Sequence, residues 1–542
     1  MKNAPLIFFV GIIIFFYACA SQSPLSGGER DVTPPKLVNA VPKNSSTNVF
    51  PKQINVEFDE FIQVKSLNQK LIVSPPLKYM PELKQKAKGF SLVIKDTLKP
   101  NTTYNFYFSD AIQDLNENNP LNDFNYVFST GEQLDSLQLA GTIFDALTLK
   151  PENNFLVMLY ADTTDSVPFK IKPDYITRTK SNGLFQFNYL KNNTYKIIGI
   201  NDKNNNYMFD PSNEKIAFQT NTIKLNKEND SLILYSFIED RTKQYIKKAE
   251  RKLPYKADII FNTVSNQKPA ILSTDINILD YYVTPNNDTL SVFFNDSLQY
   301  LNEILALKIS YSRYDSIRNN VLVIDTINLK WSGKENYKPT TSTNLQWNIK
   351  NNSKINSKQI LSILYDEPVV MDNSSIVIID SAKKQIPFVL FKDSINCLKW
   401  NIKASLADGK DYRILLNEAS VKCPYGHSLK NDTLDFETMQ PEDFASLKLN
   451  IKLPYTENFI IELMDEKNSV IKTWSINSDT NLFVERLIPG KYTLKSIADS
   501  NKNGKWDNGY YILRLQPEKI YNYHQTIQLR ANWDLEVNWT IK

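Results

Sequence analysis

The sequence is poor in the residues that most catalytic and metal centres use. Among 542 residues it has only 2 histidines, 3 cysteines and 14 glycines. It contains no G-x-S-x-G, H-E-x-x-H, P-loop or G-x-G-x-x-G pattern, so the common signatures of serine hydrolases, zinc peptidases and nucleotide-binding folds are absent. We expect His427 and His524 to be surface or core residues rather than parts of a metal site or a catalytic triad. The sequence therefore predicts that the protein is not an enzyme and requires no cofactor.

An excess of charge of one sign is also missing. The 63 lysines and arginines nearly balance the 59 acidic residues, which leaves a net charge of +4. This balance gives no reason to expect nucleic acid as a partner. One dense basic run, residues 241–256, is predicted to be a solvated connector, as charge runs usually are.

Long apolar runs are missing after the N-terminus. Residues 6–18 form an apolar stretch behind Lys2 that is too short for a stable transmembrane helix and is typical of a signal peptide. The following Phe16-Tyr17-Ala18-Cys19 resembles the lipobox of bacterial lipoproteins. We expect residues 1–18 to be removed, Cys19 to carry the lipid and residues 19–32 to be a flexible tether, so that acyl chains alone attach the protein to the membrane. The alternative is an ordinary signal peptide with an incidental cysteine.

Strand-forming residues are abundant. Short runs with period-two alternation, such as residues 54–58 and 103–108, are rich in Tyr, Phe, Ile, Val and Thr and are separated by Asn, Asp and Pro. The chain is too long for one core, and its turn signals are closely spaced. The predicted fold class is therefore all-β, a tandem array of β-sandwiches.

Two segments carry a family resemblance. Residues 33–131 contain Thr33-Pro34-Pro35, INVEFDE at 54–60, KPNTTYNFYF at 99–108 and FSTG at 128–131, and resemble the bacterial Ig-like domain of the S-layer-protein (SbsA-like) type. Residues 135–238, with GTIFD at 141–145 and NGLFQF at 182–187, resemble the transthyretin-like, carboxypeptidase-regulatory-type β-sandwich. The pair is similar to Bacteroidetes Ig-like domain lipoproteins, which implies an exported, lipid-anchored protein.

Both segments recur later in the chain. Asp59-Glu60 and Tyr104 match Asp366-Glu367 and Tyr412 at offsets of 307 and 308. A constant offset of 297 relates Leu190, Tyr195, Asp202 and Asp210 to Leu487, Tyr492, Asp499 and Asp507. We therefore predict a second Ig-like domain at 349–439, a second transthyretin-like sandwich at 440–542, and a further β-sandwich between the pairs at 239–348.

The sharpest local motif is D-x-N-x-N-x-x-x-D, which occurs twice. Its residues are Asp202, Asn204, Asn206 and Asp210 in one copy, and Asp499, Asn501, Asn503 and Asp507 in the other. Oxygen ligands at positions 1, 3, 5 and 9 of a tight loop can converge on one Ca²⁺. Both copies lack the glutamate at position 12 of an EF-hand, so a hairpin loop built of Asx-turns accounts for the same residues. The motif predicts either a weak calcium site or such a loop.

The two remaining cysteines flank a turn signal. Cys397 and Cys423 lie on either side of Asp408-Gly409, and a hairpin at this turn would place them nearly opposite each other. A cross-strand disulfide is then expected in an oxidising compartment, and two buried free thiols are the alternative.

The predicted function follows from the anchor and the lack of a site. We expect a non-catalytic outer-membrane lipoprotein, on the cell surface rather than the periplasmic face, that acts as a scaffold or accessory subunit. Its partners would be outer-membrane proteins, for example a β-barrel assembly or export complex. A surface lipoprotein that binds glycan or matrix is the first alternative, and an enzyme with an unrecognised site is the second.

Overall fold

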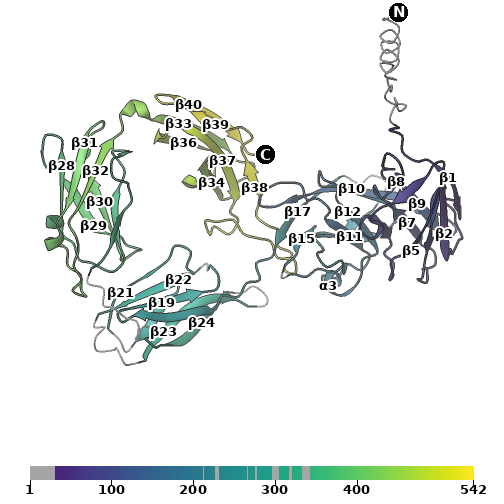
Figure 1. Ribbon diagram of the computed structural model, residues 1–542, viewed down its shortest axis with the longest axis horizontal. Coiled ribbons are helices and arrows are strands. Elements are labelled where there is room, and N and C mark those ends of the chain that lie inside the picture. Colours follow the sequence, from purple (N-terminus) through teal and green to yellow (C-terminus); the bar gives the residue numbers. More distant parts are fainter. Residues whose placement is uncertain are drawn as a thin grey trace, which may run out of the picture. The chain divides into compact units, whose positions relative to one another are not determined.

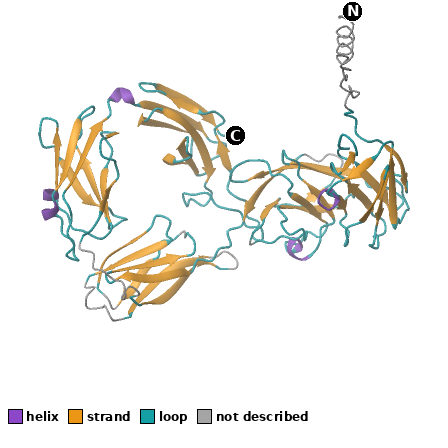
Figure 2. Cartoon of the chain, viewed as in Figure 1, coloured by secondary structure: helices purple, strands orange, loops and turns teal. Residues whose placement is uncertain are grey.

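The computed structural model describes residues 31–211, 213–225, 231–264, 267–274, 277–295, 304–315, 320–331 and 342–542. In these ranges the chain consists mainly of strands, and its helices are single turns (Figure 2). They are α2 (Leu67–Lys70), α3 (Val167–Lys170), η1 (Asn373–Ser375), η2 (Glu418–Ser420) and η3 (Pro441–Asp443). The predicted all-β fold is confirmed. The predicted signal peptide and Cys19 lie outside the described residues. None of the described helices has the length and apolar character needed to cross a membrane.

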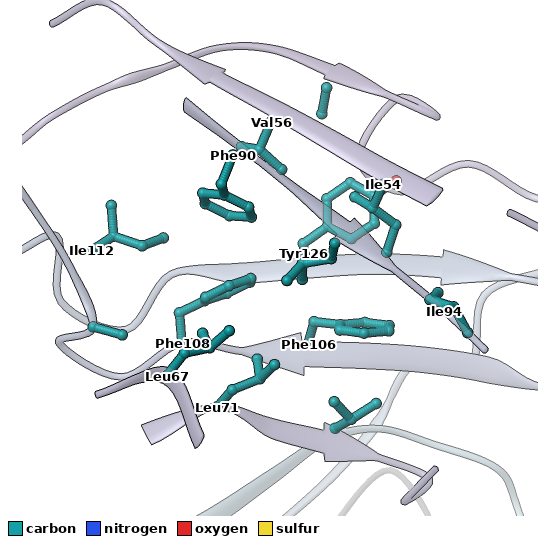
Figure 3. Close-up of a cluster of buried hydrophobic side chains, with 14 of the residues drawn as sticks. Ile54, Val56, Leu67, Leu71, Phe90, Ile94, Phe106, Phe108, Ile112 and Tyr126 are labelled. Atoms are coloured by element: carbon teal, nitrogen blue, oxygen red, sulfur yellow. The ribbon is translucent and has the colours of Figure 1, made fainter. Parts of the chain in front are cut away.

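The first module, residues 33–131, packs around aromatic side chains. Its strands are β1 (Leu37–Val41), β2 (Gln53–Phe58), β3 (Ile62–Val64), β4 (Ile72–Ser74), β5 (Glu82–Lys86), β6 (Gly89–Val93), β7 (Thr103–Tyr107), β8 (Ile112–Asp114) and β9 (Asn125–Ser129). One sheet has the order β1-β2-β6-β5 and another β4-β7-β9, while β3 pairs with β8. Phe90 of β6 and Phe108, directly after β7, meet in the core with ring centroids 5.2 Å apart (Figure 3). Burial of each such ring contributes roughly 1.5–3 kcal/mol.

The second module, residues 135–238, contains a single extended sheet. Its strands are β10 (Leu137–Asp145), β11 (Leu156–Tyr160), β12 (Tyr175–Arg178), β13 (Leu184–Leu190), β14 (Thr194–Ile200), β15 (Lys215–Phe218), β16 (Ile223–Lys224) and β17 (Leu232–Ile238). The order is β12-β11-β14-β15-β17-β10-β13, and β16 pairs with β14. All five residues of β11 are buried, which matches its uninterrupted apolar sequence.

The third module, predicted at residues 239–348, contains two sheets in the part of it that the structure describes. Its strands are β18 (Ile246–Leu253), β19 (Lys256–Phe261), β20 (Ala270–Thr274), β21 (Ile278–Val283), β22 (Thr289–Phe294), β23 (Leu305–Tyr314) and β24 (Asn320–Leu329). The sheets β18-β19-β22-β21 and β20-β23-β24 share one core.

The predicted connector at 241–256 is wrong, because most of this basic run forms β18 and the start of β19. Arg251 is fully buried and donates from Nε and Nη2 to the carbonyl of Pro254 at 3.0 and 2.6 Å. Its guanidinium also lies 5.7 Å from the ring centroid of Phe294. A basic residue in an alternating strand can thus pack inward if its donors are satisfied.

The fourth module, residues 349–439, has two four-stranded sheets. Its strands are β25 (Leu345–Trp347), β26 (Ser353–Ile355), β27 (Leu361–Tyr365), β28 (Ile376–Asp380), β29 (Phe388–Lys392), β30 (Lys399–Ala404), β31 (Asp411–Leu416) and β32 (Asp432–Thr438). The orders are β25-β27-β30-β29 and β26-β32-β31-β28, and β28, β31 and β32 lie side by side in Figure 1. Because β25 pairs with β27, this sheet begins at Leu345, before the predicted boundary at 349.

The fifth module, residues 440–542, separates the strands into two sheets. They are β33 (Ala445–Lys452), β34 (Phe459–Asp465), β35 (Val470–Ile476), β36 (Thr480–Leu487), β37 (Gly490–Ala498), β38 (Ile520–Asn522), β39 (Ile527–Leu529) and β40 (Asp534–Thr540). One sheet has the order β36-β33-β40 and the other β35-β34-β37-β38, with β39 paired to β37. The second module repeats these pairings through β13-β10-β17 and β12-β11-β14-β15, and differs by the added pairing of β15 with β17.

Hydrogen bonds repeat between the related modules as well. Tyr104 Oη accepts from the backbone N–H of Lys99 at 2.8 Å, and Tyr412 Oη accepts from that of Ala407 at 2.8 Å. Tyr195 donates to the carbonyl four residues before it at 3.0 Å, and Tyr492 does the same at 2.6 Å. The offsets seen in the sequence therefore correspond to repeated structural contacts.

Contacts divide the chain into two compact units. The first holds nearly all of the first two modules, and the second holds the other three with three short segments of the second module. The sites below each lie within one unit.

Candidate functional sites

The two D-x-N-x-N-x-x-x-D motifs occupy equivalent loops. One follows β14 in the second module and the other follows β37 in the fifth. Asp202 accepts hydrogen bonds from the backbone N–H groups of Asn206 and Tyr207 at 3.2 and 3.0 Å. Asp499 accepts from those of Asn503 and Gly504 at 3.0 and 3.1 Å. The first aspartate of each motif thus fixes the turn that follows it.

The other predicted ligands gather around the last aspartate. Asn204 and Asn206 donate from Nδ2 to Asp210 Oδ2 at 2.6 and 3.3 Å. In the second copy, Asn501 and Asn503 donate in the same way to Asp507 Oδ2, both at 2.5 Å. All eight predicted residues are therefore brought together, four in each loop. The amide oxygens accept from backbone N–H groups as in Asx-turns, for example Asn204 Oδ1 from Asn206 and Asn501 Oδ1 from Asn503, both at 3.0 Å. Each loop is therefore closed by its own side chains, and calcium binding stays a prediction.

Backbone conformation distinguishes the two copies. Tyr207 has φ of 60° and Gly504, its equivalent, has φ of 80°. Glycine adopts this left-handed conformation without steric cost, whereas tyrosine does so at a penalty. In the second copy, Glu518 accepts hydrogen bonds from the N–H groups of Ser500 and Asp507 at 2.9 and 3.0 Å and so connects the two ends of the loop. The sequence did not indicate this contact. Burial raises the pKa of Glu518.

The hairpin expected at Asp408-Gly409 does not form. The strands on either side of this turn belong to different sheets: β30 pairs with β27 and β29, and β31 pairs with β28 and β32. The structural basis of the predicted disulfide is therefore wrong, and Cys397 and Cys423 are free thiols. Burial is the main cause that raises the pKa of Cys397 to about 12 and that of Cys423 to about 11.

Cys423 instead belongs to a cluster with Glu367 and His427. Its Sγ lies 3.2 Å from Glu367 Oε1, and His427 Nδ1 lies 2.8 and 2.9 Å from the two oxygens of Glu367. The Glu367 side chain is 3% exposed and that of His427 is 11% exposed. This cluster was not predicted from the sequence, although the C-x-x-x-H spacing of Cys423 and His427 is a signal for it.

A cavity of about 370 Å³ lies within the first unit. Its lining includes Asn105, Tyr107, Asp123, Asn125, Lys180 and Gln186. The Oδ1 atoms of Asn105 and Asn125 are buried and have no hydrogen-bond partner among the described residues. Lys180 Nζ lies 3.1 Å from Asp123 Oδ1 at the same place. The walls therefore offer an aromatic ring and an ion pair together.

Residues 31–130 match the bacterial Ig-like domain family. Searching the curated proteins gives no significant match. Among solved structures, the N-terminal part of the bacterial S-layer protein SbsC is 11% identical, with 29% of this chain and 40% of that one covered and a TM-score of 0.18. The S-layer protein rSbsC(31–844) is 10% identical over 91% of this chain and 67% of that one, with a TM-score of 0.16. The SGBP-B protein of the Bacteroides ovatus mixed-linkage glucan utilization locus, in complex with a mixed-linkage heptasaccharide, is 9% identical over 73% of this chain and 94% of that one, with a TM-score of 0.18.

Proposed function

We propose that the chain is a non-catalytic lipoprotein of the outer membrane that serves as a scaffold for a membrane-protein complex. The observation that carries this proposal is the fixed joint between the fourth and fifth modules. Arg486 of β36 donates from Nη1 to Asn356 Oδ1, Ser357 Oγ and Asp408 Oδ1 at 3.1, 3.1 and 3.0 Å. Its Nη2 donates to Asp408 Oδ2, and the guanidinium lies 4.9 Å from the ring centroid of Phe444.

A second joint connects the third and fourth modules. The rings of Tyr255 and Tyr425 stack with centroids 4.3 Å apart, and Tyr425 Oη donates to the carbonyl of Phe294 at 3.0 Å. Phe293 packs with Cys397 and Leu398 in a small apolar cluster at the same joint.

Both joints use directional, mostly buried contacts. Modules that move independently on flexible linkers would not need such contacts. Fixed spacing between modules is what a scaffold needs in order to hold partner surfaces in register. The lipobox-like Cys19 supports the location at a membrane, where the partner would be an outer-membrane protein such as a β-barrel complex.

The cavity of the first unit favours a second candidate function, the binding of a surface glycan. Sugars are bound by aromatic faces together with fixed hydrogen-bonding groups, and Tyr107 with the Asp123–Lys180 pair provides both. Replacement of Tyr107 by Ala would then abolish sugar binding by the full chain.

The test of the proposed function is purification of the tagged full chain from detergent-solubilised membranes of its own bacterium. We expect an acylated protein that carries a membrane-protein partner in a fixed ratio. The Cys19→Ala variant should be unacylated and should leave the membrane fraction. Palmitate labelling that persists in this variant, or a wild-type chain that purifies alone, would contradict the proposal. A chain without partners that retains sugar binding would support the second candidate.

A further inference from the structure

We propose that Glu367, Cys423 and His427 form a binding site for a transition-metal ion, with Zn²⁺ as the best match, and that the ion fixes the loop that joins the fourth module to the third. This proposal does not depend on the scaffold function. Its three donor atoms are a carboxylate oxygen, a thiol sulfur and an imidazole nitrogen, which all lie within 4.8 Å of one another.

The spacing of the donors suits a tetrahedral ion. Zinc bonds of about 2.0–2.3 Å place neighbouring ligand atoms about 3.4 Å apart. The observed separations from Glu367 Oε1 are 2.8 Å to His427 Nδ1 and 3.2 Å to Cys423 Sγ. Shifts of roughly half an ångström in these two separations would therefore admit the ion. A water molecule can complete the coordination because Cys423 and His427 are only partly buried.

The charge of the site also favours a cation. Glu367 is almost fully buried, and no lysine or arginine of the described residues forms an ion pair with it. When the ion binds, the Cys423 thiol loses its proton to solvent and the sulfur bonds to the metal as a thiolate. The neutral His427 ring carries its proton on Nε2, so that Nδ1 bonds to the metal, and metal bonds replace the hydrogen bonds from both side chains to Glu367. Sulfur and imidazole donors select Zn²⁺ over Ca²⁺ and Mg²⁺, which prefer oxygen ligands only.

The site lies in the loop that makes the joint. Tyr425, which stacks on Tyr255, is in the middle of the five residues that begin with Cys423 and end with His427. Gly426 has φ of +74° and donates its N–H to the Cys423 carbonyl at 3.1 Å, so the loop already turns tightly between the two ligands. An ion on Cys423 and His427 would hold both ends of the segment that presents Tyr425 to the third module.

The related first module lacks these donors. The equivalent of Glu367 is Glu60, but the 308-residue offset places Leu115 and Asn119 where the fourth module has Cys423 and His427. The donor set is therefore a feature of the module that meets the third module through this loop.

The experiment is titration of the purified full chain, first treated with a chelator and a thiol reductant, with Co²⁺ and then Zn²⁺. Co²⁺ should give the absorption of a thiolate-bound tetrahedral ion, and one equivalent of Zn²⁺ should remove it. The Cys423→Ser and His427→Gln variants should each weaken binding by about tenfold or more. Cys397→Ser and His524→Gln are the matched controls, and they should bind as the wild type does.

A second measurement covers variants that fail to fold. In the wild-type chain, Zn²⁺ should protect Cys423 but not Cys397 from alkylation, as read by peptide mapping. The proposal is overturned if Co²⁺ binds without thiolate absorption, if no metal binds, or if Zn²⁺ changes the alkylation of both cysteines or of neither.

Discussion

Arg486 of the fifth module and Asp408 of the fourth form a two-pronged ion pair, with Arg486 Nη1 3.0 Å from Asp408 Oδ1 and Nη2 in contact with Oδ2. A guanidinium matches a carboxylate in this way and a lysine ammonium does not. We expect Arg486→Lys to lower the free energy of unfolding by about 1–2 kcal/mol, measured by denaturant titration of the full chain.

Arg413→Lys is the matched control for that change. Arg413 makes the same two-pronged contact with Asp435, at 2.6 and 3.0 Å, but both residues belong to the fourth module and the arginine side chain is more than half exposed. Exposed pairs contribute little, so the loss should be less than about 0.5 kcal/mol. Equal losses from both substitutions would show that the Arg486 contact does not hold a joint.

The repeated tyrosines give a test of the internal duplication. Tyr104→Phe and Tyr412→Phe each remove one hydrogen bond from a backbone N–H, in the first and the fourth module respectively. Each should cost about 0.5–1.5 kcal/mol in unfolding free energy, and the two costs should agree closely. A large loss from one substitution and none from the other would mean that the two contacts are not equivalent.

Asp123 should make the free energy of unfolding depend on pH in the acidic range. The Tyr107 hydroxyl, at 2.5 Å, is the main cause that lowers its pKa, and Lys180 contributes as well. Because its pKa is lowered in the folded chain, ionised Asp123 stabilises the fold at pH values above the ordinary aspartate pKa of about 3.9. This stabilisation is lost as the pH falls through the pKa that Asp123 has in the folded chain. Because the side chain is about half exposed, the effect should be below about 1 kcal/mol. Asp123→Asn should remove this part of the acid sensitivity, and unfolding curves that shift equally with pH in both proteins would contradict it.

The paired loops give a calcium test. If both loops bind Ca²⁺, calcium at ten times the Kd should stabilise each module by about 1.4 kcal/mol, and melting should shift upward by several degrees. Asp499→Ala should remove the response of the fifth module, Asp202→Ala that of the second, and Mg²⁺ should substitute poorly. Melting of the full chain that is indifferent to both ions would leave the loops as Asx-turn hairpins.

Local patterns in the sequence predicted the fold well, because period-two alternation and turn residues act over a few positions. This is why β2 and β7 lie where the alternating runs at 54–58 and 103–108 indicated. The burial of Arg251 was not predicted. A buried arginine needs a hydrogen-bond acceptor, here the carbonyl of Pro254, and the composition of the basic run does not reveal that acceptor.

The Glu367 cluster was not predicted from the sequence for a different reason. Glu367 and His427 are 60 positions apart and meet only because the strands between them divide over two sheets. The same division separated β30 from β31, where the turn signal at Asp408-Gly409 had predicted one hairpin. Pairing across sheets is set by the whole core, so turn chemistry alone could not fix it.

The most direct measurement of the scaffold claim is recovery of the membrane partner by the full chain with its joints intact or broken. Wild-type chain and the Arg486→Ala variant would be purified from solubilised membranes at equal yield, and partner would be quantified per chain, with Arg413→Ala as control. Our account predicts a fixed ratio with wild type and Arg413→Ala and a clear loss with Arg486→Ala, although each protein stays folded and acylated. Equal recovery by all three proteins would contradict the claim that fixed joints between modules carry the function.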